Sequence, residues 1–341
     1  MITAKDIYEA VRRREEAARP FRRWLGASIV GDTCTRKIAL TFRSAFDPNF
    51  DGRILRVFEN GHKAEDRIVA DLEAAGFKVT QRQDTFDLDG GKGHAGATVD
   101  GVLIEDGKRC LLEIKTAKAS DWNALERHGV AKAKPQHHAQ MQFGMLCAGL
   151  RNALYVAENK DTNELYLERV AFNETVANNL ATLAKQIVAD GTGDRCNDRP
   201  DWHECKRCAA FPVCKGATFP RCHCLTCCHA TAGGCDSLPG EPQVPFFTPI
   251  WTCAIADGAE IPEDVLEHGC PQHLFLPWMV NLPAEYDPND YIVEYTTPTG
   301  KRIWNCPEGS FPPVDGGEPP VIATSRVLAG RTWGEVLESQ K

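Results

Sequence analysis

The chain has 341 residues, of which 43% are apolar and 25% are charged, a composition typical of a soluble globular protein of about two domains. No segment approaches the roughly 18 consecutive apolar residues of a membrane helix, and residues 1–23 are charged and have no apolar signal-peptide core. We therefore exclude a membrane protein and expect a cytoplasmic one.

The net charge of −8 is unevenly distributed. Residues 1–215 carry 33 Lys and Arg against 31 Asp and Glu, whereas residues 216–341 carry 6 against 16. The first 45 residues contain ten basic and five acidic side chains. This basic segment suits contact with phosphates, although a solvated helix face, with Arg12 to Arg14 countered by Glu15 and Glu16, explains it equally well.

The hydrophobic periodicity predicts an alternating series of helices and strands. In chain order we expect an amphipathic helix over 4–18, a loop over 31–37 leading into a helix, a long helix over 54–75 ended by Gly76, a strand over 78–88, a hairpin around Asp100 and Glu113, a helix over 135–150, strands over 152–158 and 164–172, and a helix over 174–190. This order predicts an α/β nuclease-like core, a mixed sheet flanked by helices.

The predicted hairpin carries the most informative side chains, Asp100 and the run Glu113-Ile114-Lys115. Alternation along a strand places Glu113 and Lys115 on one face and turns Ile114 into the core. If Asp100 ends the preceding strand, two carboxylates and one ammonium meet at one sheet edge. Such a set binds a hard divalent cation and positions an attacking water. A solvated Glu-x-Lys face and a turn aspartate are the plain alternative.

Beyond residue 215 the composition changes, because Pro, Gly and Cys become frequent and helical periodicity is absent until residues 332–338. Residues 291–295 and 301–304 resemble a β-hairpin. We predict three parts: a nuclease domain over 1–215, a cysteine-rich zinc-binding module over 216–280, and a small hairpin-containing segment over 281–341.

Fifteen cysteines in a chain without an export signal indicate metal binding rather than disulfides. Cys222, Cys224, Cys227, Cys228 and Cys235 lie close together in the sequence. Cys224-x2-Cys227, with Cys253 and either Cys270 or His273, would complete a tetrahedral zinc site, which a region poor in aliphatic residues needs. The alternative is a set of free thiols in a loosely ordered tail.

Residues 20–215 resemble the PD-(D/E)xK nuclease superfamily, and most closely its RecB-type exonucleases. That branch includes phage recombination nucleases and the iron–sulfur exonucleases of CRISPR adaptation. Besides Asp100 and Glu113-Ile114-Lys115, the helix 60–65 resembles the family's first motif and 136–142 its glutamine-bearing helix. The family often has Tyr near that helix, where this chain has Phe143.

The resemblance implies that Glu65, Asp100 and Glu113 hold catalytic Mg²⁺ or Mn²⁺, with His62 as a further ligand. It also implies that Lys115 orients the attacking water and that Gln140 contacts this water or the scissile phosphate.

A 4Fe–4S cluster is the second implied cofactor. One early and three late cysteines hold it in the cluster-bearing exonucleases, which here implies Cys34 and the spaced set Cys205-x2-Cys208-x5-Cys214. Cys196 is a spare candidate, and a four-cysteine zinc site stays open from the residue types alone.

The resemblance thus implies a phage or bacterial DNA exonuclease that processes DNA ends or single strands for recombination or repair, with a recombination or repair protein as a further partner. Two alternatives are a non-catalytic nucleic-acid- or protein-binding subunit with structural metal sites, and an endonuclease on the same core.

Overall fold

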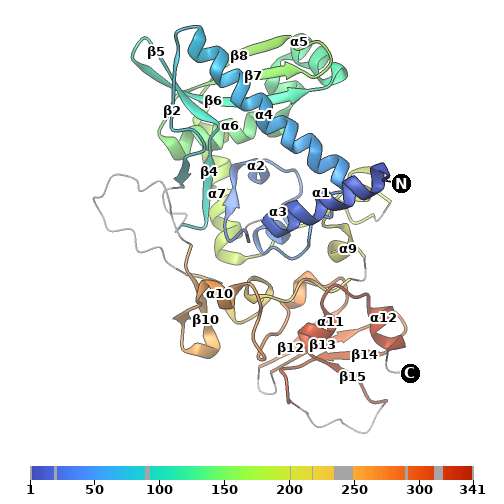
Figure 1. Cartoon of the computed structure of the whole chain (residues 1–341). Helices are drawn as coiled ribbons and strands as arrows, with labels where there is room; N and C mark the ends of the chain where they lie inside the picture. The colour runs from blue at the N-terminus through green and yellow to red at the C-terminus, as the bar shows by residue number, and fades with distance from the viewer. Residues whose placement is uncertain are drawn as a thin grey trace.

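The computed structural model describes residues 2–18, 21–88, 93–199, 201–216, 218–233, 249–288, 291–310 and 318–339. It is a mixed α/β structure in which helices flank several sheets, with the C-terminal region below the larger N-terminal one in the view of Figure 1. No helix in these described ranges is both long enough and apolar enough to span a bilayer.

The central sheet has five strands in the order β2-β5-β6-β7-β8. They are β2 (Lys78–Thr80), β5 (Gly101–Glu105), β6 (Lys108–Ala117), β7 (Asn152–Asn159) and β8 (Leu165–Ala171). β5 and β6 form an antiparallel hairpin closed by Asp106-Gly107, both with positive φ, as a two-residue hairpin turn requires. β6 and β7 are parallel, so the chain must cross over between them.

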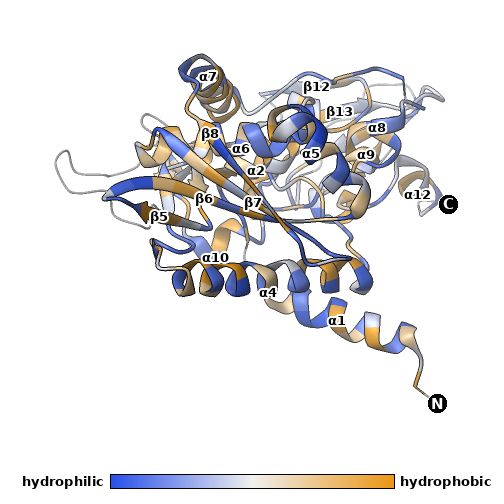
Figure 2. Ribbon diagram, turned by 90° about the horizontal axis from the view of Figure 1, so that it is seen from above, coloured by the Kyte–Doolittle hydropathy of each residue, from blue (hydrophilic) through white to orange (hydrophobic). Residues whose placement is uncertain are grey.

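Helices cover both faces of this sheet (Figure 2). α4 (Gly52–Ala74) lies on one face, where its Ile68 and Val69 join a hydrophobic cluster with Leu112 and Ile114 of β6. α5 (Ala119–Ala133) and α6 (Pro135–Ala148) form the crossover and, together with α7 (Glu174–Asp190), cover the other face. Gly144 permits the close approach of α6, because a Cβ there would lie 2.9 Å from Leu111 Cδ1.

The predicted strand over 78–88 is two strands. β2 joins the central sheet, whereas β3 (Thr85–Asp87) joins a small sheet with β1 (Leu25–Gly26) and β4 (Ala95–Thr98). The chain changes sheets at Gln81 and Gln83, which both adopt positive φ. The predicted helices over 4–18 and 174–190 are confirmed as α1 (Ala4–Ala18) and α7.

The segment after α7 is attached to the start of α3 (Thr35–Phe42), which follows α2 (Ala27–Val30). The Arg36 N–H donates to Asp194 O at 2.8 Å, and the Asp194 N–H donates to Thr35 Oγ1, also at 2.8 Å. Gly193 makes this contact possible, since a Cβ there would lie 2.4 Å from Thr35 O. The segment that follows α7 is therefore joined to the start of α3 by main-chain contacts.

After α7, the described residues form short elements only. The first of these are the helices α8 (His203–Lys206) and α9 (Phe211–Cys214) and the 3₁₀ turn η1 (Cys224–Thr226). A three-stranded sheet follows, formed by β9 (Ala230–Ala232), β10 (Trp251–Cys253) and β11 (Ala259–Glu260), with β10 in the centre. After α10 (Glu263–Leu266) and η3 (Pro277–Met279) comes a four-stranded sheet, with its strands in chain order: β12 (Ala284–Asp287), β13 (Ile292–Thr296), β14 (Arg302–Asn305) and β15 (Val321–Ala323). Two short helices follow, α11 (Ser325–Leu328) and α12 (Trp333–Glu338). The predicted hairpin is confirmed as β13 and β14.

The main hydrophobic cluster continues across residue 215. Leu225, Trp251 and Leu266 belong to the same buried cluster as α6 and the central sheet. The Trp251 ring lies 5.4 Å from that of Phe42 on α3, and its Nε1–H donates to Arg23 O at 3.2 Å. A separate cluster lies under β13 and β14. The boundaries at 215/216 and 280/281 stay predictions.

Candidate functional site

Asp100, Glu113 and Lys115 meet at one edge of the central sheet. Asp100 directly precedes β5, and its carboxylate accepts a 2.7 Å hydrogen bond from the Ile114 N–H of β6. Lys115 Nζ contacts the Glu113 carboxylate and lies 4.0 Å from Asp100 Oδ2. Glu113 and Lys115 share a strand face because side chains alternate. The two carboxylates therefore lie on either side of one ammonium.

Glu65 approaches the same group from α4. Burial and the charge of Asp100 raise its pKa, while His62 and Lys115 oppose the rise. The Glu65 carboxylate is therefore close enough for the charges of Asp100 and Lys115 to act on it, and its own charge acts on Glu113; His62 is exposed one turn earlier on the helix.

The site is almost dry at its centre. The Glu113 side chain is 3% exposed, against 15% for Asp100 and 27% for Lys115. Burial raises the pKa of Glu113 to about 7, with Lys115 opposing the rise and Asp100 and Glu65 adding to it. Burial alone would lower the pKa of Lys115, but Glu113 and Asp100 outweigh it and raise the pKa. The cluster therefore has excess negative charge.

Two residues without a predicted role, His137 and Tyr155, extend the site. Tyr155 on β7 lies opposite Glu113 in the parallel register, and its hydroxyl is 2.9 Å from His137 Nδ1 on α6. Burial and then Lys115 lower the pKa of His137 to about 4, so the ring is neutral at pH 7. The helix α6 itself carries Phe143 and no tyrosine. Tyr155 on β7 nevertheless places a tyrosine hydroxyl beside this helix.

The two glutamines of α6 differ in their surroundings. Gln142 is fully buried, donates to Ala171 O at 3.0 Å and accepts from the Asn173 N–H at 2.7 Å. Gln140 is half-buried, and its side chain forms no hydrogen bond to another described residue. Gln142 therefore joins α6 to the loop after β8, whereas Gln140 keeps its amide available.

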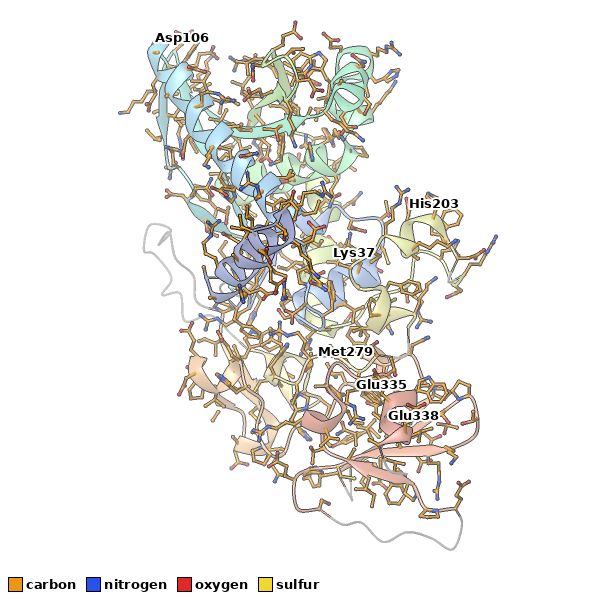
Figure 3. All side chains as sticks on the ribbon, turned by 45° about the vertical axis from the view of Figure 1, so that its right-hand side comes forward. Lys37, Asp106, His203, Met279, Glu335 and Glu338 are labelled. Atoms are coloured by element: carbon orange, nitrogen blue, oxygen red, sulfur yellow. The ribbon has the colours of Figure 1, made fainter. Side chains whose placement is uncertain are left out.

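The second feature is a cavity of about 360 Å³ lined by five cysteines: Cys34, Cys196, Cys205, Cys208 and Cys214. Cys34 precedes α3, and the late cysteines lie on or beside α8 and α9; Lys37 and His203, labelled in Figure 3, mark α3 and α8. The structure thus brings the four predicted cluster cysteines to one cavity, together with Cys196.

The charged residues that line this cavity are mostly basic. Lys37, Arg195, Arg207 and Lys215 line it, against the acidic Asp32 and Glu204. Burial would lower the pKa of Lys37, but its 2.5 Å contact with Asp32 and the nearby thiols of Cys208 and Cys34 raise it. Burial nevertheless raises the pKa of the Cys208 thiol, and a backbone hydrogen bond from Ala210 and the charge of Lys37 oppose the rise only in part.

A tight group of ligand atoms occurs elsewhere. Over the described ranges, one set of three His, Cys or acidic side chains has all its ligand atoms within 4.8 Å of one another, namely Cys227, Cys228 and His229. Neither the three carboxylates nor the cavity cysteines are packed so closely.

The other predicted zinc ligands surround this set more loosely. Burial, followed by the neighbouring thiols of Cys227 and Cys270, raises the pKa of Cys224 to about 12. His273 Nε2 lies 2.9 Å from His223 O and 3.2 Å from Thr226 Oγ1, whereas its Nδ1 is buried without a hydrogen-bond partner among the described residues. Cys235 lies outside the described residues.

No protein-family model and no curated protein matches this chain. Among solved structures, it is similar to the alkaline exonuclease LHK-Exo from Laribacter hongkongensis, with 20% identity, a TM-score of 0.38, and coverage of 52% of this chain and 92% of that one. The structure of LHK-Exo in complex with dAMP has 18% identity and a TM-score of 0.37, and the match covers 55% of this chain and 92% of that one. The structure of SSO0001 has 14% identity and a TM-score of 0.39, and the match covers 62% of this chain and 96% of that one. These likenesses are distant.

The raised pKa of Glu113 predicts a pH-dependent stability of the metal-free protein. Below pH 4.5 this carboxyl is protonated in the folded and unfolded states, and between pH 4.5 and 7 the folded state holds a proton that the unfolded state has lost. Stability should therefore fall as the pH rises through this window, by up to roughly 3 kcal/mol. Glu113→Gln should remove most of the decline.

The measurement is urea unfolding in EDTA from pH 4 to 8. Asp106→Asn is the matched control, because it removes an exposed carboxylate from the tip of the same hairpin, as Figure 3 shows. If the stability of Glu113→Gln fell with rising pH as steeply as that of the wild type, the fall could not be assigned to the Glu113 carboxyl.

Proposed function

We propose that this chain is a divalent-metal-dependent deoxyribonuclease that acts as an exonuclease on DNA ends. The observation that carries the proposal is the convergence of Glu65, Asp100 and Glu113 around the ammonium of Lys115 at one sheet edge. Three carboxylates with one cation in a nearly dry site leave negative charge uncompensated. Oxygen ligands of this kind suit Mg²⁺ or Mn²⁺.

Glu65, Asp100 and Glu113 would hold the metal, with His62 at the margin. A bound divalent ion would supply a nucleophilic water at neutral pH and stabilise charge on the phosphate. Lys115 donates hydrogen bonds and would orient the attacking water beside Glu113. The Asp100 carboxylate is fixed by its hydrogen bond from the Ile114 N–H, which preserves the geometry of the pair.

The helix α6 would contact the scissile phosphate or the water through Gln140. His137 is neutral and holds the Tyr155 hydroxyl beside Glu113, so it acts as a positioning residue. The basic N-terminal segment would guide the DNA backbone. A role in recombination or repair, with a protein partner, belongs to the same proposal.

A 4Fe–4S cluster held by Cys34, Cys205, Cys208 and Cys214 completes the proposal. Zn–S bonds of about 2.3 Å keep the sulfurs of a tetrahedral zinc site about 3.8 Å apart. The cavity cysteines are spaced more widely than this, because no three of them have their sulfurs within 4.8 Å of one another, as the ligand atoms of Cys227, Cys228 and His229 do. A cluster separates its four cysteines further than a single ion does. The cavity volume of about 360 Å³ and its basic lining suit an anionic cluster.

The activity test uses end-labelled linear duplex DNA and covalently closed circular DNA with Mn²⁺. We expect degradation of linear DNA only, its loss in EDTA, and a rate at least about 100-fold lower in Glu113→Ala and Asp100→Asn. Asp106→Asn should keep the wild-type rate. Cleavage of neither substrate would favour a binding subunit, and cleavage of the circle would indicate an endonuclease.

The two glutamines of α6 provide a matched pair. Gln140→Ala should lower the cleavage rate at least about 10-fold without changing the unfolding midpoint. Gln142→Ala should instead lower the free energy of unfolding by about 1–3 kcal/mol, because it leaves the Asn173 N–H and Ala171 O without partners. If Gln140→Ala cleaved DNA at the wild-type rate, Gln140 would have no part in the reaction.

The cluster is tested by purification without oxygen. We expect a brown protein with broad visible absorption and about four iron atoms per chain, both lost in Cys205→Ser and Cys214→Ser. Cys110→Ser, which alters a buried thiol on β6, should keep the colour. A colourless wild type that contains zinc in place of iron would support the four-cysteine zinc site instead.

A further inference from the structure

A second group of sulfur and nitrogen ligands lies where the main hydrophobic cluster meets the C-terminal cluster. Its core is the tripeptide Cys227-Cys228-His229, whose ligand atoms all lie within 4.8 Å of one another. Cys227 packs in the main cluster and Cys228 against the C-terminal one. This spacing suits a single metal ion, for which Zn–S bonds of about 2.3 Å place the ligand atoms about 4 Å apart.

The main chain fixes this tripeptide on both sides. The Cys228 N–H donates to Leu274 O at 2.9 Å, and Cys227 forms a β-bridge with Phe275. His229 O accepts from the Ala254 N–H at 2.9 Å, so Cys253 lies next to the tripeptide. The three ligands are therefore preorganised rather than carried on a free loop.

His229 has an unmet polar requirement. The residue is 6% exposed, and its Nε2 is buried without a hydrogen-bond partner among the described residues. The ring lies near Tyr286 and Tyr291, at centroid distances of 6.4 and 5.9 Å, which hold its orientation. His94, His223 and His273 also each have one buried ring nitrogen without a partner, but among the described residues only His229 lies within 4.8 Å of two further ligand atoms. A metal ion would satisfy this nitrogen.

Cys253 is available as a fourth ligand. It lies on β10 opposite Ala230, one residue beyond the tripeptide. Its sulfur lies outside the 4.8 Å set in the metal-free structure. Three sulfurs and one imidazole nitrogen form a common structural zinc set.

A buried cation from the nuclease region faces this group. Arg43, beside the end of α3, is 5% exposed and donates to Leu225 O and Ala230 O at 3.3 and 3.1 Å. It forms no ion pair with Asp or Glu in the described ranges, and its guanidinium lies 5.0 Å from the centre of the Trp251 ring. A negatively charged zinc–thiolate site beside Leu225 and Ala230 would stabilise this cation further.

We propose that Cys227, Cys228, His229 and Cys253 bind one Zn²⁺ ion where the main hydrophobic cluster meets the C-terminal one, with Arg43 as a nearby cation. The site differs from the set predicted from sequence, because Cys228 and His229 replace Cys224, Cys270 and His273 as ligands. It is independent of the proposed nuclease chemistry.

The test measures zinc in the full-length protein by elemental analysis, alongside iron. About one zinc per chain is expected in the wild type, with a loss of more than half in Cys228→Ser and in His229→Ala. Cys224→Ser and Cys270→Ser, which alter surrounding thiols, and Cys306→Ser, a remote buried thiol, should keep the wild-type content. Iron should not change in any of these variants.

A second measurement needs no variant. Alkylation of the wild-type protein, followed by mass spectrometry, should show Cys227, Cys228 and Cys253 protected until a zinc chelator is added, and Cys224 and Cys270 unaffected by the chelator. Three results would overturn the proposal: a wild type without zinc, zinc retained in both Cys228→Ser and His229→Ala, or zinc lost in Cys224→Ser and Cys270→Ser instead.

Discussion

The rest of the structure depends on one electrostatic constraint, the placement of the Lys115 ammonium between Asp100 and Glu113. Three carboxylates in a nearly dry site repel one another, and one buried cation does not neutralise them. Such a group persists only where its positions are set by rigid elements. The hairpin turn, the parallel pairing of β6 with β7 and the long helix α4 supply those elements, and α6 covers the opposite face of the sheet from α4.

The cysteine cavity and the carboxylate site share the helix α6. Pro135 and Gln136 at its start line the cavity, and the Gln136 amide donates to Ser28 O at 3.0 Å. Gly31, just before the Cys34 loop, approaches Ala139 so closely that an added Cβ would lie 2.5 Å from that of Ala139. Any group that orders the cavity therefore also fixes the helix that faces the carboxylates.

Local patterns predicted much of this arrangement, because strand alternation alone places Glu113 with Lys115. Tyr155 was not predictable, since its position beside Glu113 depends on a parallel register between strands separated by two helices. The split of the strand over 78–88 depends on positive φ at two glutamines, which their residue type does not signal. Spacing likewise favoured Cys224 with Cys227, whereas the tight ligand set is consecutive in sequence.

The contact of Asp194 and Gly193 with the start of α3 has a mechanical consequence. These hydrogen bonds join residue 194 to residues 35 and 36, and so close a loop of chain that contains every strand of the central sheet. A pull applied directly beside residues 35 and 194 would act on these hydrogen bonds before it reached the strands that carry the carboxylates.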